Sequence, residues 1–161
     1  MKLRKLVPYG AVVLLAVVLD QAIKFVVEAR LPLHQGIDLL PFLALLHSRN
    51  TGVAFSMFSG VGGLWLSLAV LGVIAFIAVL AFRTEATQLF ARVGFALIIG
   101  GALGNLIDRA LRGFVVDYVY FHTPFWSFAI FNLADAFITV GAGLVILDEV
   151  LAWRRGRKAE E

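Results

Sequence analysis

The sequence predicts an all-α membrane protein: a bundle of four transmembrane helices with a small β-rich cradle, formed by two loops on the extracytoplasmic side. Of the 161 residues, 61% are hydrophobic and 16% are charged, and the mean hydropathy is +0.92. A soluble domain of this size could not bury so much apolar surface. The chain also contains four apolar stretches of about 20 residues, the length of helix that crosses the hydrocarbon core of a bilayer.

The four predicted helices comprise residues 6–27, 64–82, 92–109 and 133–151. They take up most of the chain, so we expect residues 1–161 to form a single integral membrane domain. The basic start followed by an apolar run resembles a cleavable signal peptide. Because this run is too long for a signal peptide and three more spans follow, we interpret it as a retained first helix.

The distribution of Lys and Arg predicts the orientation in the membrane. Most of them flank one side of the predicted bundle: Lys2, Arg4, Lys5, Arg83, Arg92, Arg154, Arg155, Arg157 and Lys158. Positive residues are retained in the cytoplasm during insertion. Both termini are therefore predicted to be cytoplasmic, and the loops of residues 28–63 and 110–132 to be outside. Basic residues gathered at the termini suit a membrane surface, and we expect no binding of nucleic acid.

The two outer loops contain segments too short to span the membrane. Residues 37–46 are apolar, and residues 114–121 are rich in β-branched and aromatic side chains. These patterns are typical of short strands or interfacial segments. Phe125 and Trp126 follow the second segment and indicate an aromatic belt at the level of the lipid headgroups.

Ionisable groups inside the hydrocarbon cost several kcal/mol, so each one is a candidate functional residue. Asp20 and Lys24 lie four residues apart, on one face of the first helix and in its outer half. Two interpretations remain open for them. They could form an ion pair that helps the helix to pack, or they could take a direct part in the chemistry.

The third predicted helix combines small residues with polar ones. Residues 100–104, Gly-Gly-Ala-Leu-Gly, form a surface that lets another helix backbone come close. Asn105, Asp108 and Arg109 continue this helix toward its outer end, and all three can face the interior of the bundle.

Two further acids lie near the outer boundary of the membrane. Asp117 interrupts the strand-like segment, and Asp135 is at the third position of the fourth helix, after Asn132 as N-cap. Taken singly, a strand-edge carboxylate and a capping acid would explain them. The topology, however, puts both carboxylates on one side of the membrane at one depth. Two carboxylates a few ångström apart share one proton near neutral pH. Such a pair can activate water and protonate a leaving amine, so the sequence predicts hydrolysis of peptide bonds.

Other catalytic constellations have little support. His34, His47 and His122 do not have the spacing of a zinc motif, and Ser48, Ser56 and Ser67 lack the context of a nucleophile. The chain has no cysteine. We expect neither a metal nor another cofactor. An ion-coupled carrier and a non-catalytic assembly subunit remain as alternatives, although the chain shows no internal repeat of the kind that carriers use.

Five motifs occur in this order: Asp20-x-x-x-Lys24, Asn50-Thr-Gly-Val-Ala-Phe55, Gly101-Ala-Leu-Gly-Asn-Leu-Ile-Asp-Arg109, Val115-Val-Asp117 and Phe131-Asn-Leu-Ala-Asp135. In these motifs the chain resembles bacterial lipoprotein signal peptidase, also called signal peptidase II, over nearly its whole length. A small difference occurs at Ser56, where many relatives carry glycine.

The resemblance implies an aspartyl endopeptidase of the bacterial inner membrane. Such an enzyme removes signal peptides from prolipoproteins, just before a cysteine that carries a diacylglyceryl group. Asp117 and Asp135 match the catalytic pair of the family, and Asp20 and Lys24 match a structural pair. The family's residues that line or support its active site correspond in this chain to Asn50, Gly52, Asn105, Arg109, Asn132 and Ala134.

Further expectations concern partners and protonation. The resemblance implies inhibition by cyclic-peptide antibiotics of the globomycin type, which wedge between the aspartates. Membrane lipid surrounds the helices, and we expect a monomer. Because the dipole at the start of the fourth helix favours an anion, we expect Asp135 to be ionised and Asp117 to be the proton donor before attack.

Overall fold

The structure is a computed structural model that describes residues 7–52 and 63–160. Residues 53–55 of the second motif and Ser56 lie outside the described residues. Four long helices form the body of the protein: α1 (Val7–Arg30), α2 (Gly63–Arg83), α3 (Leu89–Arg112) and α4 (Leu133–Glu160). Each contains an apolar stretch of 19 to 24 residues that could cross a membrane. The predicted fold class is confirmed.

The helices extend further than the apolar stretches that predicted them. The third helix begins at Leu89 instead of residue 92 and ends at Arg112 instead of residue 109. Arginine is a good helix former, and cations in a last turn interact favourably with the helix dipole. Gly113 ends α3 in a left-handed conformation with φ of 79°, and its N–H donates to the carbonyl oxygen of Arg109 at 3.1 Å. Asp108 and Arg109 therefore lie inside α3, one turn before its end, and not at its terminus.

Helix α3 is the centre of the bundle and packs against α1, α2 and α4. A Cβ atom on Gly100 would lie 2.7 Å from Cβ of Ala16 in α1, and one on Gly101 would collide with the carbonyl oxygen of Ala134 in α4. The prediction that these small residues permit close approach is confirmed. One glycine thus admits α1 and the next admits α4, so α3 holds both helices at short range.

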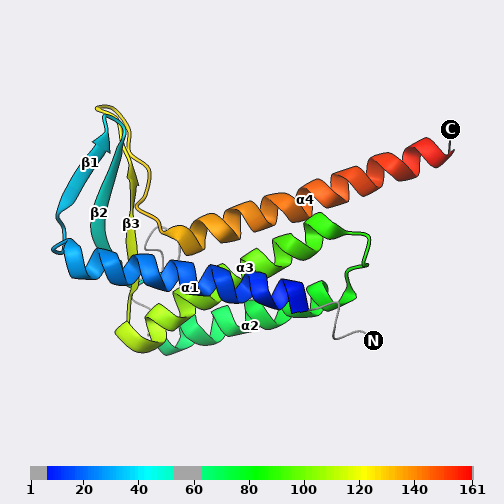
Figure 1. Ribbon diagram of the computed structural model, residues 1–161, viewed down its shortest axis with the longest axis horizontal. Helices are drawn as coiled ribbons and strands as arrows, with labels where there is room; N and C mark the ends of the chain where they lie inside the picture. Colours follow the sequence, from blue (N-terminus) through cyan, green and yellow to red (C-terminus); the bar gives the residue numbers. More distant parts are fainter. Residues whose placement is uncertain (1–6, 53–62, 161) are drawn as a thin grey trace.

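A three-stranded antiparallel sheet stands at one end of the bundle, while α1 begins and α4 ends at the other (Figure 1). Its strands are β1 (Gly36–Leu40), β2 (Leu43–Asn50) and β3 (Val115–Phe121), in that order. Strand β3 packs on the end of α1 through a core of Val27, Leu31, Val116 and Tyr118. This core anchors β3, and with it Asp117, to the helices.

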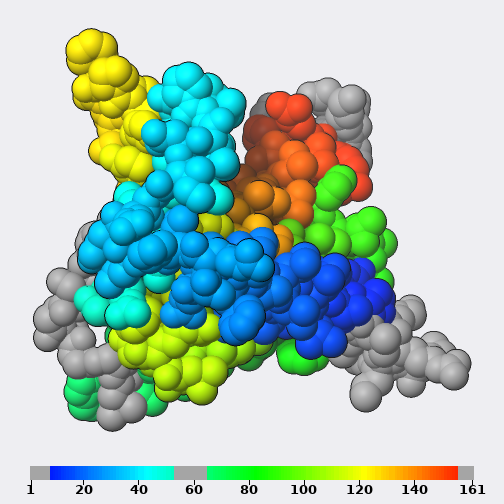
Figure 2. All heavy atoms as spheres, turned by 60° about the vertical axis from the view of Figure 1, so that its left-hand side comes forward, coloured from blue at the N-terminus to red at the C-terminus, as the bar shows by residue number. Residues whose placement is uncertain are grey.

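After β3 the chain turns back and enters α4. The N–H of Phe131 donates to the carbonyl of Val119 at 3.0 Å, and the N–H of Val119 donates to the carbonyl of Phe131 at 2.8 Å. The intervening segment and the β1–β2 hairpin project from the helices (Figure 2). Phe125 is 99% exposed and Trp126 is 59% exposed at this projection. The return of the chain beside β3 brings the start of α4 close to Asp117.

Candidate active site

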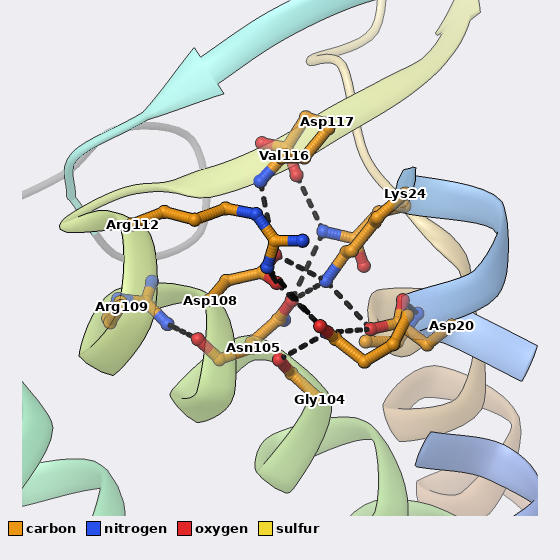
Figure 3. A network of polar contacts seen from close by, with 12 residues as sticks. Asp20, Lys24, Gly104, Asn105, Asp108, Arg109, Arg112, Val116 and Asp117 are labelled. Atoms are coloured by element: carbon orange, nitrogen blue, oxygen red, sulfur yellow. Dashed lines mark hydrogen bonds and ion pairs between the residues drawn. The ribbon is translucent and has the colours of Figure 1, made fainter. Parts of the chain in front are cut away.

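The predicted site residues come from five elements that meet at the sheet end of the bundle: α1, β2, α3, β3 and α4. Helix α1 supplies Asp20 and Lys24, and the last turns of α3 supply Asn105, Asp108 and Arg109. Figure 3 shows Lys24 among Asp20, Asn105 and Asp108, with Asp117 of β3 above them and Arg109 to one side. Asp135 lies in the first turn of α4. Elements that are far apart in the chain therefore converge on one region.

Asp117 is buried and accepts hydrogen bonds from two side-chain amides. Asn50 Nδ2 donates to its Oδ2 at 3.0 Å, and Asn132 Nδ2 donates to its Oδ1 at 2.6 Å. Burial raises the pKa of Asp117 to about 6, and the negative charge of Asp135 acts in the same direction. The two amide donors oppose this shift because they stabilise the anion. Asp117 can therefore exchange a proton close to neutral pH.

Asp135 and Asn132 form a reciprocal cap at the start of α4. The N–H of Asp135 donates to Asn132 Oδ1 at 3.0 Å, and the N–H of Asn132 donates to Asp135 Oδ2 at 3.2 Å. This is the pattern of a capping box. The other carboxylate oxygen, Oδ1, accepts from Asn105 Nδ2 at 2.8 Å. Capping and orientation of the carboxylate are thus achieved by the same contacts.

Asn132 links the two carboxyl groups directly. Its side chain donates to Asp117 and its backbone N–H donates to Asp135. The same Nδ2 also donates to Asn105 Oδ1 at 3.2 Å, and Asn132 is fully buried. The structure therefore brings Asp117 and Asp135 into one polar cluster, as the topology of the sequence led us to expect.

A buried ionic cluster lies beneath the aspartates, in the interior of the bundle. Lys24 is fully buried and contacts Asp20 Oδ2 and Asp108 Oδ2, both at 2.8 Å, and Asn105 Oδ1 at 2.9 Å. The predicted placement of Asp20 and Lys24 on one face is confirmed. A Cβ on Gly104 would lie 2.5 Å from Asp20 Oδ2, so only glycine leaves room for this carboxylate. Ala134, also fully buried, donates its N–H to Asp20 Oδ1 at 3.0 Å.

Sequence reasoning missed the outer members of this cluster. Gln21 donates to Asp108 Oδ1 at 2.9 Å and to the carbonyl of Gly104 at 3.1 Å. Arg112 pairs with Asp108 Oδ1 at 2.7 Å and with Glu28 Oε2 at 2.9 Å. The spacing of four residues from Lys24 to Glu28, and from Asp108 to Arg112, was the signal that could have found two of them.

Arg109 and Asn50 position Gly52 beside the aspartates. Arg109 Nη2 donates to the carbonyl of Gly52 at 2.6 Å, and the N–H of Gly52 donates to Asn50 Oδ1 at 3.0 Å. The guanidinium lies within electrostatic range of Asp135 and Asp117. Its buried Nε has no hydrogen-bond partner in the part of the chain that the structure describes.

Tyr118 is another residue that sequence reasoning missed. Its hydroxyl oxygen accepts from the N–H of Leu133, the first residue of α4, at 3.1 Å. Burial raises the pKa of Tyr118 to about 12, so the phenol remains neutral at physiological pH. Within residues 7–52 and 63–160, no group of three or more His, Asp or Glu side chains could hold a metal ion. The polar side chains that meet at this site are carboxylates, amides, cations and the phenol of Tyr118.

Comparison with known proteins identifies the family. The family described as signal peptidase (SPase) II matches residues 12–151. The lipoprotein signal peptidase of Mesorhizobium japonicum is 60% identical over 148 residues, which are 92% of this chain and 88% of that protein. The protein of the same name from Brucella ovis is 59% identical over 146 residues, 91% of each chain.

Two solved structures, both described as bacterial membrane enzymes, share the fold. One has a TM-score of 0.79 at 30% identity and covers 89% of this chain and 87% of its own. The other has a TM-score of 0.75 at 31% identity and covers 87% of this chain and 90% of its own. The resemblance seen in the motifs is confirmed, and the chain belongs to the signal peptidase II family of aspartic-type membrane peptidases.

Proposed function

We propose that this peptidase cleaves diacylglyceryl-modified prolipoproteins just before the lipidated cysteine, and that Asp117 and Asp135 are its catalytic pair. The observation that carries the proposal is the double role of Asn132, which donates to Asp117 through its side chain and to Asp135 through its backbone. This shared partner holds the carboxyl groups in one polar cluster. Such a pair supplies both a base and an acid for amide hydrolysis.

The contacts support different roles for the two acids. Each acid accepts N–H groups on both oxygens, but Asp135 also lies at the positive end of the α4 dipole, so we assign it the anionic state. Asp117 has a raised pKa and carries the proton. Asp135 removes a proton from a water molecule as the oxygen of that water attacks the scissile carbonyl. Asp117 protonates the nitrogen that leaves when the C–N bond breaks.

Arg109 is suited to orient the substrate backbone. Its Nη2 is held by the carbonyl of Gly52, whereas its buried Nε has no partner within the described residues. A buried N–H without a partner is costly. We assign this N–H to a backbone carbonyl of the substrate, next to the bond that is cleaved.

The arrangement of charges supports an orientation in the inner membrane. Arg83, Arg92, Arg154 and Arg155 lie toward the ends of helices away from the sheet. By the positive-inside rule this end, with both chain termini, is cytoplasmic. The sheet and the aspartates then lie on the extracytoplasmic side, where a signal helix and two acyl chains arrive from within the bilayer. The enzyme acts as a single integral membrane domain and as a monomer, and cyclic peptides of the globomycin type compete with the substrate.

The test is cleavage of defined precursors by the purified protein in detergent, followed as a size shift on a gel. A diacylglyceryl-modified prolipoprotein is expected to be cut, leaving the lipidated cysteine as the new N-terminus. The same precursor without the diacylglyceryl group serves as the matched control and is expected to remain intact. Equal cleavage of both precursors would refute the proposed specificity. Failure to cleave the modified precursor would refute the proposed function.

The pH dependence of kcat/KM is expected to reflect the buried carboxyl of Asp117. Its pKa is raised to about 6, first by burial and then by the charge of Asp135. The donor is protonated below this value and loses its proton as the pH rises through it, so kcat/KM should fall over that interval. Initial rates measured on either side of this value check the prediction. A kcat/KM that rises over the same interval would contradict the assignment of Asp117 as donor.

A further inference from the structure

We propose that Lys24 is a positioning residue for hydrolysis, which fixes the backbone beside each catalytic aspartate and orients the Asn105 amide toward Asp135. This inference rests on the proposed function, because it gives Lys24 a part in the reaction of Asp117 and Asp135. An ion pair that only helped α1 to pack would need a single carboxylate partner. Lys24 instead makes three contacts, and each of them leads to the catalytic pair.

The three N–H donors of the ammonium group each have an acceptor. Asp20 Oδ2 and Asp108 Oδ2 each lie 2.8 Å from Nζ, and Asn105 Oδ1 lies 2.9 Å from it. Lys24, Asp20 and Asp108 are all fully buried. An ammonium group inside the bundle must satisfy all its donors. The position of Nζ is therefore determined by three groups, from two helices, at once.

Two of these acceptors hold the backbone next to the catalytic acids. Asp20 Oδ1 accepts the N–H of Ala134, the residue before Asp135, at 3.0 Å. Asp108 Oδ2 accepts the N–H of Val116, the residue before Asp117, at 3.2 Å, as Figure 3 shows. Lys24 lies between the two carboxylates. The start of α4 and strand β3 are thus held at their present separation through one cation.

The third acceptor determines the direction of the amide hydrogen bonds. An ammonium group can only donate, so the atom of Asn105 that faces Lys24 must be its oxygen. Its Nδ2 must then face Asp135 Oδ1, to which it donates at 2.8 Å. The same oxygen accepts from Asn132 Nδ2, which also donates to Asp117 Oδ1. The chain of hydrogen bonds that begins at Lys24 therefore ends in N–H donors on both carboxylates.

The positive charge of Lys24 also acts on Asp117. Burial raises the pKa of Asp117 most, and the charge of Asp135 raises it further, whereas the amides of Asn50 and Asn132 and the charge of Lys24 lower it. Arg109 and Tyr118 are also within electrostatic range of Asp117. Loss of the Lys24 charge would therefore raise the pKa of Asp117.

The experiment compares Lys24→Met with Arg112→Met in kcat, in thermal stability and in the pH at which kcat/KM falls as Asp117 loses its proton. Arg112 binds the same Asp108, but its other contacts in the described cluster are with Gln21 and Glu28. Lys24→Met is expected to lower kcat about 100-fold, as misplaced reacting groups do. It should also move the fall of kcat/KM to higher pH, because the positive charge of Lys24 lowers the pKa of Asp117. Arg112→Met should lower thermal stability and leave this fall in place.

Asn105→Asp provides a second arm, which decides the matter if Lys24→Met does not fold. It keeps an oxygen for Lys24 but, when ionised, offers no N–H to Asp135. In a folded protein we expect kcat to fall as it does in Lys24→Met. If Asn105→Asp keeps the wild-type kcat, and any folded Lys24→Met loses rate only in proportion to its folded fraction, the proposal is wrong. A wild-type protein that cleaves no prolipoprotein would instead refute the proposed function itself.

Discussion

Asp117→Asn and Asp135→Asn are each expected to lower kcat by roughly 10³-fold or more, because each removes the acid or the base of a pair that works as one unit. The substitutions keep the shape of the side chain, and an asparagine oxygen can still accept one of the amide hydrogen bonds. Cleavage of a diacylglyceryl-modified prolipoprotein, followed on a gel under single-turnover conditions, provides the measurement. Retained turnover in either variant would contradict the assignment of the pair.

The same substitution at Asp117 should separate activity from stability. The pKa of Asp117 is about 6 in the folded protein, whereas the ordinary value of 3.8 applies to the unfolded chain. Between these values the folded state binds more protons than the unfolded state, so the stability of the wild type falls as the pH rises from about 4 to about 6. Above that range the ionised Asp117 costs about 3 kcal/mol, at about 1.4 kcal/mol per pH unit.

Asp117→Asn lacks this buried charge. At pH 8 its thermal unfolding in detergent should therefore occur at or above the wild-type temperature, although it is inactive. Its stability should also vary less than that of the wild type between pH 4 and pH 6. A strongly destabilised Asp117→Asn at pH 8 would indicate that Asp117 serves mainly as a structural carboxylate of strand β3.

Asn132→Asp is expected to keep the N-cap of α4 and to lose about 100-fold or more in kcat. Aspartate is as good an N-cap as asparagine, so it can still accept the N–H of Asp135 at the start of α4. The amide that donates to Asp117 Oδ1 and to Asn105 Oδ1 is replaced by an acceptor. A third carboxylate beside the pair also disturbs the single shared proton.

Asn132→Ala is the matched comparison for this variant, because it removes the cap as well as the donor. It should lose about 1 kcal/mol of stability in addition to activity. Thermal unfolding and kcat, measured on both variants, distinguish the two roles of Asn132. Wild-type activity in Asn132→Asp would mean that the donor to Asp117 has no part in the reaction.

Features that depend on neighbours in the chain could be predicted from the amino-acid sequence. The apolar stretches predicted four helices, since a helix in lipid satisfies its backbone groups internally. The pairing of Asp20 with Lys24 follows from their spacing of four residues, and the cap of Asn132 and Asp135 from a spacing of three. Local periodicity was sufficient for these predictions.

Contacts between distant segments required the folded chain. Val116 donates to Asp108, Ala134 donates to Asp20, and Asn50 donates to Asp117. The last contact depends on the register of β2 against β3, where a shift by one residue would turn Asn50 to the other face of the sheet. No repeat or spacing in the chain encodes such a register.

The amino-acid sequence was therefore enough to predict the spans, the two acids and the family they belong to. How Lys24 connects to both acids through Asp20, Asp108 and Asn105 became visible only in three dimensions. The physical reason is that helix periodicity is a local property, whereas the meeting of α1, α3, β3 and α4 depends on close packing around the glycines of α3.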